Sequence, residues 1–219
     1  MSSPSTQNSS RKSKSALFEE LRNSGLEDER VLVAMEGLSR EIFVPLGFKR
    51  RSYENTPLPI GQGQTLSQPY TVALMTSALE LVCGEKILEV GTGSGYQTAL
   101  LARLGARVYT VERIASLAVG ARARLEKAGY DNITYRVGDG STGWPEHAPY
   151  DRILVAAAGP DIPACLVEQL AEGGILVMPV GEDYDQTLLA CRRRGKKLER
   201  KILCGCLFVP LIGEEGWGG

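Results

Sequence analysis

Three carboxylates follow one another at comparable places in three successive apolar segments of this chain. Glu89 precedes a glycine-rich turn, Glu112 ends the next apolar segment, and Asp139 follows the third. Glu112 lies 21 residues beyond Gly91, the separation at which an acid accepts hydrogen bonds from the ribose hydroxyls of a ligand held by such a turn. Any one of these acids fits a solvated loop, but three together favour a nucleoside site.

The turn beside these acids has the pattern Gly-x-Gly-x-Gly. Gly91, Gly93 and Gly95 lie between an apolar segment at residues 86–90 and a helical pattern that begins at Thr98. Without Cβ atoms, the backbone N–H groups can approach a ligand closely, and the start of the helix adds a positive end. A glycine loop by itself is equally consistent with a tight structural turn that binds nothing, so the neighbouring acids must decide between these two interpretations.

A long polar segment at residues 53–68 collects neutral hydrogen-bonding side chains between prolines and glycines. These side chains are Gln62, Gln64, Thr65, Ser67 and Gln68. Pro69 follows, and proline suits the first turn of a helix. We expect this segment to be a loop that lines a site.

Strand and helix patterns alternate around these residues. The predicted strands are 86–90, 107–112, 132–137, 150–156 and 175–179, and the predicted helices are 69–81, 98–102, 116–128 and 163–170. This alternation predicts an α/β fold with a doubly wound parallel sheet, whose carboxyl edge would bring the three acids to one crevice. Residues 17–38 fit one or two amphipathic helices, and residues 187–209 fit an antiparallel hairpin around a basic turn at 192–197.

The ends of the chain differ in composition from the rest. Residues 1–15 are Ser-rich and basic with few apolar side chains, so they cannot bury enough surface to become ordered. We therefore expect a disordered tail at 1–15, a single domain at 16–213 and a flexible tail at 214–219.

Composition excludes several classes of function. A net charge of −1 gives no general attraction to nucleic acid or to an anionic membrane, and no apolar run reaches membrane-spanning length. The five cysteines have no Cys-x-x-Cys spacing, and His147 is the single histidine, so neither a disulfide framework nor a metal site is expected. We expect a cytoplasmic protein.

An adenosine ligand leaves two main classes of enzyme, a dinucleotide oxidoreductase and an S-adenosylmethionine methyltransferase. Glu89 directly upstream of the glycines would repel a pyrophosphate but could hold the α-ammonium of a methionine moiety. Asp139 could accept from an exocyclic amine, and the backbone of Gly140 could face a base edge. These features favour the methyl donor.

With these motifs together, the chain resembles the protein-L-isoaspartate (D-aspartate) O-methyltransferase family over most of its length, from Arg40 to about Gly213. The matching segments are Arg40 with 43–45, 58–61, 63–70, 88–97, 111–113, 138–140, 169–170 with 173–174, 179–181 and 208–211. The resemblance implies a seven-stranded, mostly parallel class I methyltransferase (Rossmann-like) sheet with N-terminal helices and a C-terminal antiparallel hairpin. It also implies a cytosolic monomer that repairs aged proteins.

The resemblance also implies roles for individual residues. Ser67 would be the active-site serine. The implied S-adenosyl-L-methionine contacts are Gln64, Thr65 and Leu66 in the closing loop, Glu89, Gly91, Thr92, Gly93 and Gly95 at the methionine part, Glu112 at the ribose, and Asp139 and Gly140 at the adenine. Many members have His at Gln62 and Thr at Ile212, so no imidazole or hydroxyl contact is expected at those two positions.

The implied reaction methylates the free α-carboxylate of an L-isoaspartyl residue and converts the donor to S-adenosyl-L-homocysteine. The resemblance also implies D-aspartyl residues as possible acceptors. Such a carboxyl has a pKa of roughly 3.5 and is ionised at neutral pH, so no general base is needed. The expected partners are isoaspartyl peptides and proteins, with no nucleic acid and no membrane. A nucleic-acid methyltransferase, supported only by the basic turn, and a non-enzymatic adenosine-binding module are the open alternatives.

Overall fold

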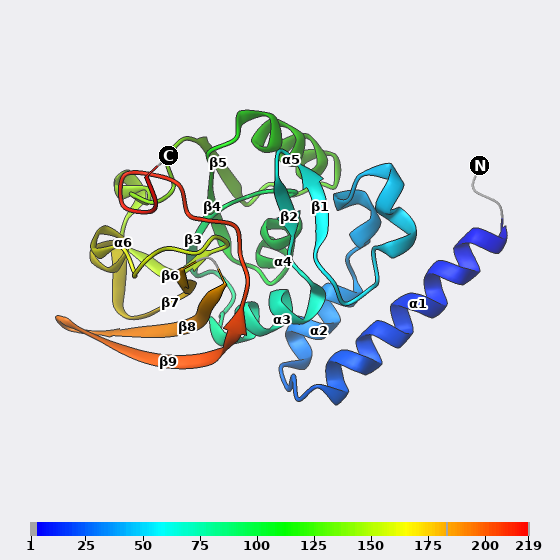
Figure 1. The fold of residues 1–219 in the computed structure, drawn as a ribbon, viewed down its shortest axis with the longest axis horizontal. Helices are drawn as coiled ribbons and strands as arrows, with labels where there is room; N and C mark the ends of the chain where they lie inside the picture. Colours follow the sequence, from blue (N-terminus) through cyan, green and yellow to red (C-terminus); the bar gives the residue numbers. More distant parts are fainter. Residues whose placement is uncertain (1–3, 183, 219) are drawn as a thin grey trace.

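The computed structural model describes residues 4–182 and 184–218, with side chains from Lys14 onward within those ranges. Its centre is a seven-stranded sheet in the order β5-β4-β3-β6-β7-β8-β9 (Figure 1). The strands are β3 Lys86–Val90, β4 Arg107–Glu112, β5 Ile133–Val137, β6 Tyr150–Val155, β7 Leu170–Glu182, β8 Asp185–Arg194 and β9 Lys197–Cys206. The first five in sheet order pair in parallel, whereas β8 and β9 are antiparallel. The predicted mostly parallel sheet with a C-terminal hairpin is confirmed.

Helices cover both faces of this sheet. The four helices of the parallel region are α3 Pro69–Ala78, α4 Tyr96–Arg103, α5 Ala115–Lys127 and α6 Ala164–Gln169. Met75 of α3 and Leu101 of α4 pack with Ile87 on one face, while Leu166 of α6 packs with Leu88 on the other. Alternate residues of β3 are buried on opposite faces of the sheet, which explains why most side chains of this strand are apolar. Since helices cover both faces, the sheet is doubly wound, as predicted.

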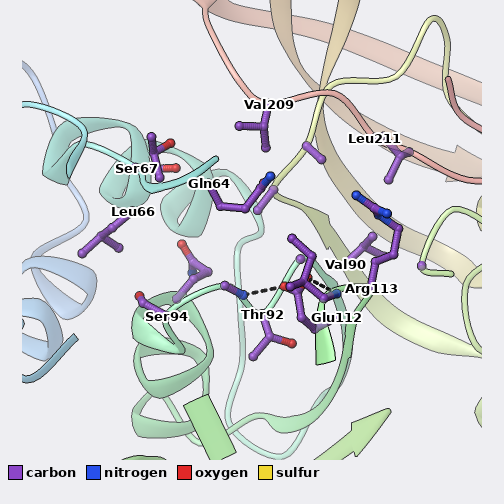
Figure 2. A pocket seen from close by; sticks show the side chains of 18 of the residues that line it. Gln64, Leu66, Ser67, Val90, Thr92, Ser94, Glu112, Arg113, Val209 and Leu211 are labelled. Atoms are coloured by element: carbon purple, nitrogen blue, oxygen red, sulfur yellow. Dashed lines mark hydrogen bonds between the residues drawn. The ribbon is translucent and has the colours of Figure 1, made fainter. Parts of the chain in front are cut away.

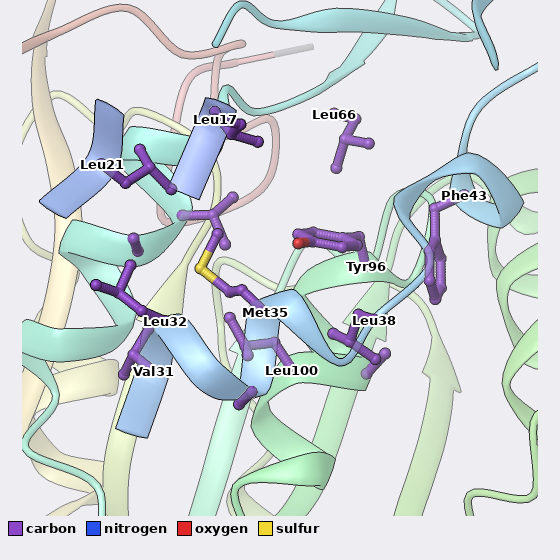
Figure 3. Packing of buried hydrophobic residues seen from close by; sticks show 14 of the residues in the cluster. Leu17, Leu21, Val31, Leu32, Met35, Leu38, Phe43, Leu66, Tyr96 and Leu100 are labelled. Carbon is purple, nitrogen blue, oxygen red and sulfur yellow. The ribbon is translucent and has the colours of Figure 1, made fainter. Parts of the chain in front are cut away.

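A further layer comes from the N-terminal segment. It contains α1 Pro4–Asn23, α2 Glu29–Glu36 and two short 3₁₀ helices, η1 Arg40–Phe43 and η2 Leu46–Arg51. Asp28 caps α2 by accepting from the backbone N–H groups of Arg30 and Val31. Figure 3 shows Met35 and Phe43 packed around Tyr96 of α4, which joins this layer to the sheet. The expected N-terminal helices are therefore present.

Helix α1 begins earlier than the sequence predicts. It includes residues 4–15, for which composition predicts a loose tail. Figure 1 shows this end of α1 pointing away from the sheet. Residues 1–3 of the predicted tail lie outside the described residues. The division of the chain at residue 15 stays a prediction.

The C-terminal segment, for which we expected a flexible tail at 214–219, makes several hydrogen bonds to the rest of the chain. The N–H groups of Glu214 and Glu215 donate to Asp139 Oδ2 and Ser141 Oγ, at 2.8 and 3.0 Å. The indole Nε1–H of Trp217 donates to the carbonyl of Ala158 at 2.9 Å. The flexible tail at 214–219 stays a prediction, and residue 219 lies outside the described residues.

The polar segment at 53–68 contains a small hairpin that the sequence did not predict. Strands β1 Leu58–Gly61 and β2 Gln64–Leu66 pair in antiparallel fashion and form a separate two-stranded sheet. The turn between them carries positive φ angles at Gln62 (54°) and Gly63 (69°). Strands of three or four residues are too short to give a period-2 signal, which explains why the sequence predicts only a loop here.

The C-terminal hairpin has a shorter turn than the predicted basic turn at 192–197. Strand β8 continues through Arg194, which pairs with Lys197 of β9. The side chain of Arg192 donates to the carbonyl of Gly173, and that of Arg193 donates to carbonyls at the end of α6. Two of the basic side chains thus hold neighbouring elements. None of the helices in the described part of the chain is long and apolar enough to cross a membrane.

Candidate functional site

A pocket opens at the carboxyl ends of β3 and β4, where the parallel strands of an α/β sheet place ligands. It is bounded by β2 with Ser67 directly after it, by the glycine turn, by the end of β4 and by residues 209–212. Its empty volume is about 1040 Å³, a figure that includes open solvent at the mouth. Glu112 and Arg113 are the ionisable side chains among its lining residues.

Most of the predicted site residues meet in this pocket. The lining includes Gln64, Thr65, Leu66, Ser67, Gly91, Thr92, Gly93, Glu112 and Gly140. Figure 2 shows Gln64 and Ser67 on the opposite side of the pocket from Glu112. Glu89, Gly95 and Asp139 are not among the lining residues. The structure therefore brings nine of the twelve predicted residues to one place.

Glu112 is held in a single orientation. Its Oε2 accepts from the backbone N–H of Gly93 at 2.8 Å, and its Oε1 accepts from that of Ile114 at 2.9 Å (Figure 2). The residue is 7% exposed. Since a carboxylate oxygen can accept more than one hydrogen bond, both oxygens keep capacity for the two hydroxyls of a ribose.

Glu89 lies in β3, just before the glycine turn, and its side chain is not part of the pocket wall. Its Oε2 accepts from Thr98 Oγ1 at 2.6 Å and from Thr110 Oγ1 at 2.7 Å, while Oε1 has no hydrogen-bond partner. Complete burial raises the pKa of Glu89 to about 7. The predicted contact with a donor ammonium is not what this geometry offers, because the side chain of Glu89 points toward α4, where Thr98 lies.

Glu89 nevertheless acts on the pocket through a hydrogen-bonded chain. The Oγ1 atoms of Thr92 and Thr110 are 2.6 Å apart. Since Thr110 donates its proton to Glu89, the hydroxyl of Thr92 must donate to Thr110. Glu89 thus fixes Thr92, which lines the pocket.

Gly95 is also placed differently from its predicted role. It is the N-cap residue of α4, with φ at 87°, a conformation that glycine adopts at little cost. A Cβ atom there would lie 3.1 Å from Leu125 Cδ1 and 3.3 Å from Ala121 Cβ of α5. Gly95 therefore allows α4 and α5 to pack closely, and it does not contact the pocket.

Asp139 faces the C-terminal segment. Its Oδ1 accepts from the backbone N–H and the hydroxyl of Ser141, at 2.8 and 2.7 Å, and its Oδ2 accepts from Glu214. Burial acts to raise the pKa of Asp139, but these hydrogen bonds outweigh burial and hold the pKa below its ordinary value. The neighbouring Gly140 does line the pocket, and a Cβ atom there would lie only 2.6 Å from Val90 Cγ1.

Ser67 stands in the two-residue connection between β2 and α3 and is half-buried. Its backbone carbonyl accepts from Nη2 of Arg40 at 2.7 Å, and the residue lines the pocket. No lining residue is a His, Lys or Asp, and the carboxylate of Glu112 is already held by two backbone N–H groups. The pocket is therefore built to bind and orient, without an evident general base.

Comparisons with known proteins place this fold and pocket in a family. A family model described as protein-L-isoaspartate(D-aspartate) O-methyltransferase matches residues 11–216. The chain belongs to this family.

Individual relatives agree with that membership. The chain is 50% identical over 219 residues to protein-L-isoaspartate O-methyltransferase 2 of Pelobacter propionicus, covering 99% of this chain and 97% of the relative. It is 52% identical to protein-L-isoaspartate O-methyltransferase of Dictyoglomus thermophilum, covering 92% and 91% of the two chains.

Solved structures of the family share the fold. One protein-L-isoaspartate O-methyltransferase matches with a TM-score of 0.82 at 28% identity, covering 93% of this chain and 67% of the other. A Plasmodium falciparum structure assigned to the same family, solved in complex with S-adenosyl-L-homocysteine, matches with a TM-score of 0.78 at 26% identity, covering 90% and 97%. Members of the family use S-adenosyl-L-methionine as the methyl donor.

The residues of this family member fit an adenosyl ligand. Glu112 offers two fixed carboxylate oxygens. The backbone of Gly140 can take its place in the pocket wall because glycine has no Cβ atom, which would collide with Val90. The N–H of Gly93, by contrast, is already engaged by Glu112. The pocket therefore suits a neutral nucleoside in two ways. The carboxylate of Glu112 can accept hydrogen bonds from hydroxyl groups, and the backbone of Gly140 can approach the ligand closely.

Reasoning from the sequence missed several parts of the pocket wall, and two of these parts belong to motifs of the family resemblance. One of them is the segment 209–212, which a bridge between Ala158 and Pro210 holds across the strand ends. The other is Arg113, which follows Glu112 in the chain. The available signal was the family resemblance, since Phe208-Val-Pro-Leu211 and Val111-Glu-Arg113 are among its motifs.

Proposed function

We propose that this protein transfers a methyl group from S-adenosyl-L-methionine to the free α-carboxylate of L-isoaspartyl residues in damaged proteins. The products are a methyl ester and S-adenosyl-L-homocysteine. The observation that carries the proposal is the pocket itself, in which the fixed carboxylate of Glu112 lies across from Gln64 and Ser67. Membership of the isoaspartate methyltransferase family supports the choice of acceptor.

The donor side of the pocket is formed by the glycine turn and the ends of β4 and β5. When bound, S-adenosyl-L-methionine supplies an activated methyl group on a positively charged sulfur. Glu112 binds the ribose hydroxyls, Gly140 lies against the adenine, and Gly91 and Thr92 border the methionine part. We assign Glu89, Gly95 and Asp139 supporting roles, because each holds a segment that lines the pocket.

The acceptor side is formed by β2 and by Ser67, which follows it. An α-carboxylate is ionised at neutral pH, so the enzyme has no proton to remove. Ser67 donates a hydrogen bond from its hydroxyl that orients the carboxylate, and the amide of Gln64 borders the same space. Alignment of carboxylate oxygen, methyl carbon and sulfur, together with exclusion of water, lowers the barrier by several kcal/mol.

The ester completes repair without further help from the protein. The neighbouring amide nitrogen displaces methanol and closes a succinimide, and hydrolysis returns part of the material to normal aspartate. D-aspartyl residues are a second acceptor in this proposal. We expect the substrate to bind as a flexible, extended segment against residues 53–68, and we expect the enzyme to act as a monomer in the cytoplasm.

The basic hairpin gives weak support to a nucleic-acid acceptor. Arg192 and Arg193 donate to backbone carbonyls of the protein, so their donors are partly engaged. Transfer of label from the donor to RNA would favour this alternative. A protein that binds the donor without any transfer to peptide would instead be an adenosine-binding module.

The decisive experiment compares two peptides that differ only in Asp and isoAsp at one position. Methyl transfer from labelled donor to the isoAsp peptide alone is the expected result. Equal labelling of both peptides, or labelling of neither, would overturn the proposal. A folded domain with isoaspartate in a rigid segment serves as the comparison for accessibility, and it should react more slowly than the free peptide.

A further inference from the structure

Arg40 is the largest of the fully buried side chains, and it is a cation. It is 1% exposed, and two of its guanidinium nitrogens, Nε and Nη1, have no hydrogen-bond partner. Burial lowers its pKa. Burying a guanidinium whose hydrogen bonds to water are not fully replaced costs several kcal/mol. A protein with an apolar side chain of similar volume at such a position is often at least as stable. The presence of arginine therefore calls for a reason other than stability.

Two contacts of the Arg40 guanidinium join the two sides of the pocket. Nη2 donates to the backbone carbonyl of Ser67 at 2.7 Å, on the acceptor side. The guanidinium carbon lies 4.7 Å from the ring centroid of Tyr96, the first residue of α4, directly after Gly95 of the glycine turn. Phe43, from the same short helix as Arg40, packs edge-on against that ring at 5.4 Å.

The segment that carries Ser67 needs such a link. Strands β1 and β2 pair only with each other, and no backbone ladder connects them to the seven-stranded sheet. An isolated two-stranded hairpin is marginally stable in water. Leu58 and Leu66 bury their side chains in the hydrophobic cluster that contains Tyr96, and this packing gives support without a preferred direction. Figure 3 shows Leu66 in this cluster. The hydrogen bond from Arg40 adds a directional constraint at Ser67 itself.

We propose that Arg40 is a positioning residue for methyl transfer, which fixes Ser67 relative to the glycine turn through its contacts with the Ser67 carbonyl and the Tyr96 ring. This inference rests on the proposed function. Arg40 does not line the pocket and does not touch the reacting groups. It acts through Ser67, and it sets where the acceptor carboxylate stands with respect to the donor.

The test is Arg40→Met, which keeps length and apolar volume but removes the donor and the charge. We expect kcat on an isoaspartyl peptide to fall by about 100-fold, since a misplacement of about 1 Å has that cost. Binding of S-adenosyl-L-homocysteine, measured by calorimetry, should change by less than about 3-fold, because Glu112 and Gly140 are untouched. Arg40→Lys should recover part of kcat, since an ammonium can still donate to the Ser67 carbonyl.

Arg152→Met is the matched control. Arg152 is also well buried, with 11% of its side chain exposed, and it also donates to backbone carbonyls, those of Leu79 and Glu80, but it does not line or brace the pocket. This variant should lower the melting temperature and leave kcat and KM unchanged. The comparison separates positioning from general stability.

The outcomes distinguish the two proposals. If the wild-type chain transfers no methyl group to the isoaspartyl peptide, the proposed function fails. If the wild type is active and folded Arg40→Met has the same kcat, or loses donor affinity in parallel with kcat, the role of Arg40 is refuted. Should Arg40→Met not fold, Arg40→Lys takes its place, and a loss of donor affinity in parallel with kcat in that variant would refute the role equally.

Discussion

The backbone N–H of Glu214 donates to Asp139 Oδ2 at 2.8 Å, although the two residues lie 75 positions apart in the chain. Gly213 makes this approach possible, because a Cβ atom there would lie 2.1 Å from Asp139 Oδ1. The carboxylate of Asp139 thus links the loop at the end of β5 to the end of the chain. Gly140, in that loop, borders the proposed adenine site.

Replacing Glu214 with Pro should test this link. Glu214 is the second residue of a turn closed by a hydrogen bond from Gly216 N to Gly213 O at 3.2 Å, a position that proline favours. The substitution therefore removes little besides the N–H. Loss of a hydrogen bond to a charged group costs about 1.5–3 kcal/mol. Only part of this cost reaches the loop that contains Gly140, so donor affinity should weaken by up to about 10-fold in calorimetric titration. Glu214→Ala keeps the N–H and should bind as the wild type does; equal weakening of both variants would contradict the link.

Glu112→Gln should weaken the donor more strongly. The amide has one oxygen for two backbone N–H groups, from Gly93 and Ile114, and it places an NH₂ group beside one of them. We expect affinity for S-adenosyl-L-homocysteine to fall by about 10- to 100-fold. A 2′-deoxy analogue of the ligand provides the control in a double-mutant cycle. If both proteins discriminate equally between the two ligands, Glu112 does not contact the ribose.

Ser67→Ala should separate catalysis from donor binding. Since the hydroxyl orients the acceptor carboxylate and does not attack it, kcat should fall by roughly 10- to 100-fold, and initial rates with the isoaspartyl peptide measure this. Affinity for the donor should stay within about 2-fold. Ser116→Ala, an exposed serine on α5, should leave both quantities unchanged. A large loss of donor binding in Ser67→Ala would argue against the orienting role.

Glu89 should make stability depend on pH. Burial raises its pKa from an ordinary value of 4.5 to about 7, so the folded protein keeps a proton that the unfolded chain releases between these two values. The contribution of Glu89 to the free energy of unfolding is therefore complete below about pH 4.5 and is lost as the pH rises to about 7. The loss amounts to roughly 3 kcal/mol at most.

Urea denaturation of the wild type and of Glu89→Gln at pH 5 and pH 8 measures this effect. The glutamine cannot ionise, so the decrease in unfolding free energy between the two pH values should be smaller in this variant. Glu126→Gln, which removes an exposed partner of Arg122, should keep the wild-type dependence. Equal dependence in all three proteins would mean that Glu89 does not titrate in this range.

Local sequence patterns determined much of the fold. The apolar segments before Glu112 and Asp139 are short and bounded by glycines or polar residues, so they identify strands without reference to the rest of the chain. Because parallel strands end at one edge of a sheet, the same patterns predicted that the segments following β3, β4 and β5 would meet at one pocket. The helix that starts at Pro69 follows from the conformation of proline itself.

Tertiary structure alone decided what the individual acids do there. Glu89 and Glu112 have the same side chain and both stand beside the glycine turn, yet one accepts hydrogen bonds from buried threonines and the other from backbone N–H groups at the pocket. The direction of each side chain depends on what packs against each face of its strand, which no local pattern records. The hydrogen bonds from Arg40 to Ser67 and from Glu214 to Asp139 join positions far apart in the chain, so only the folded arrangement could reveal them.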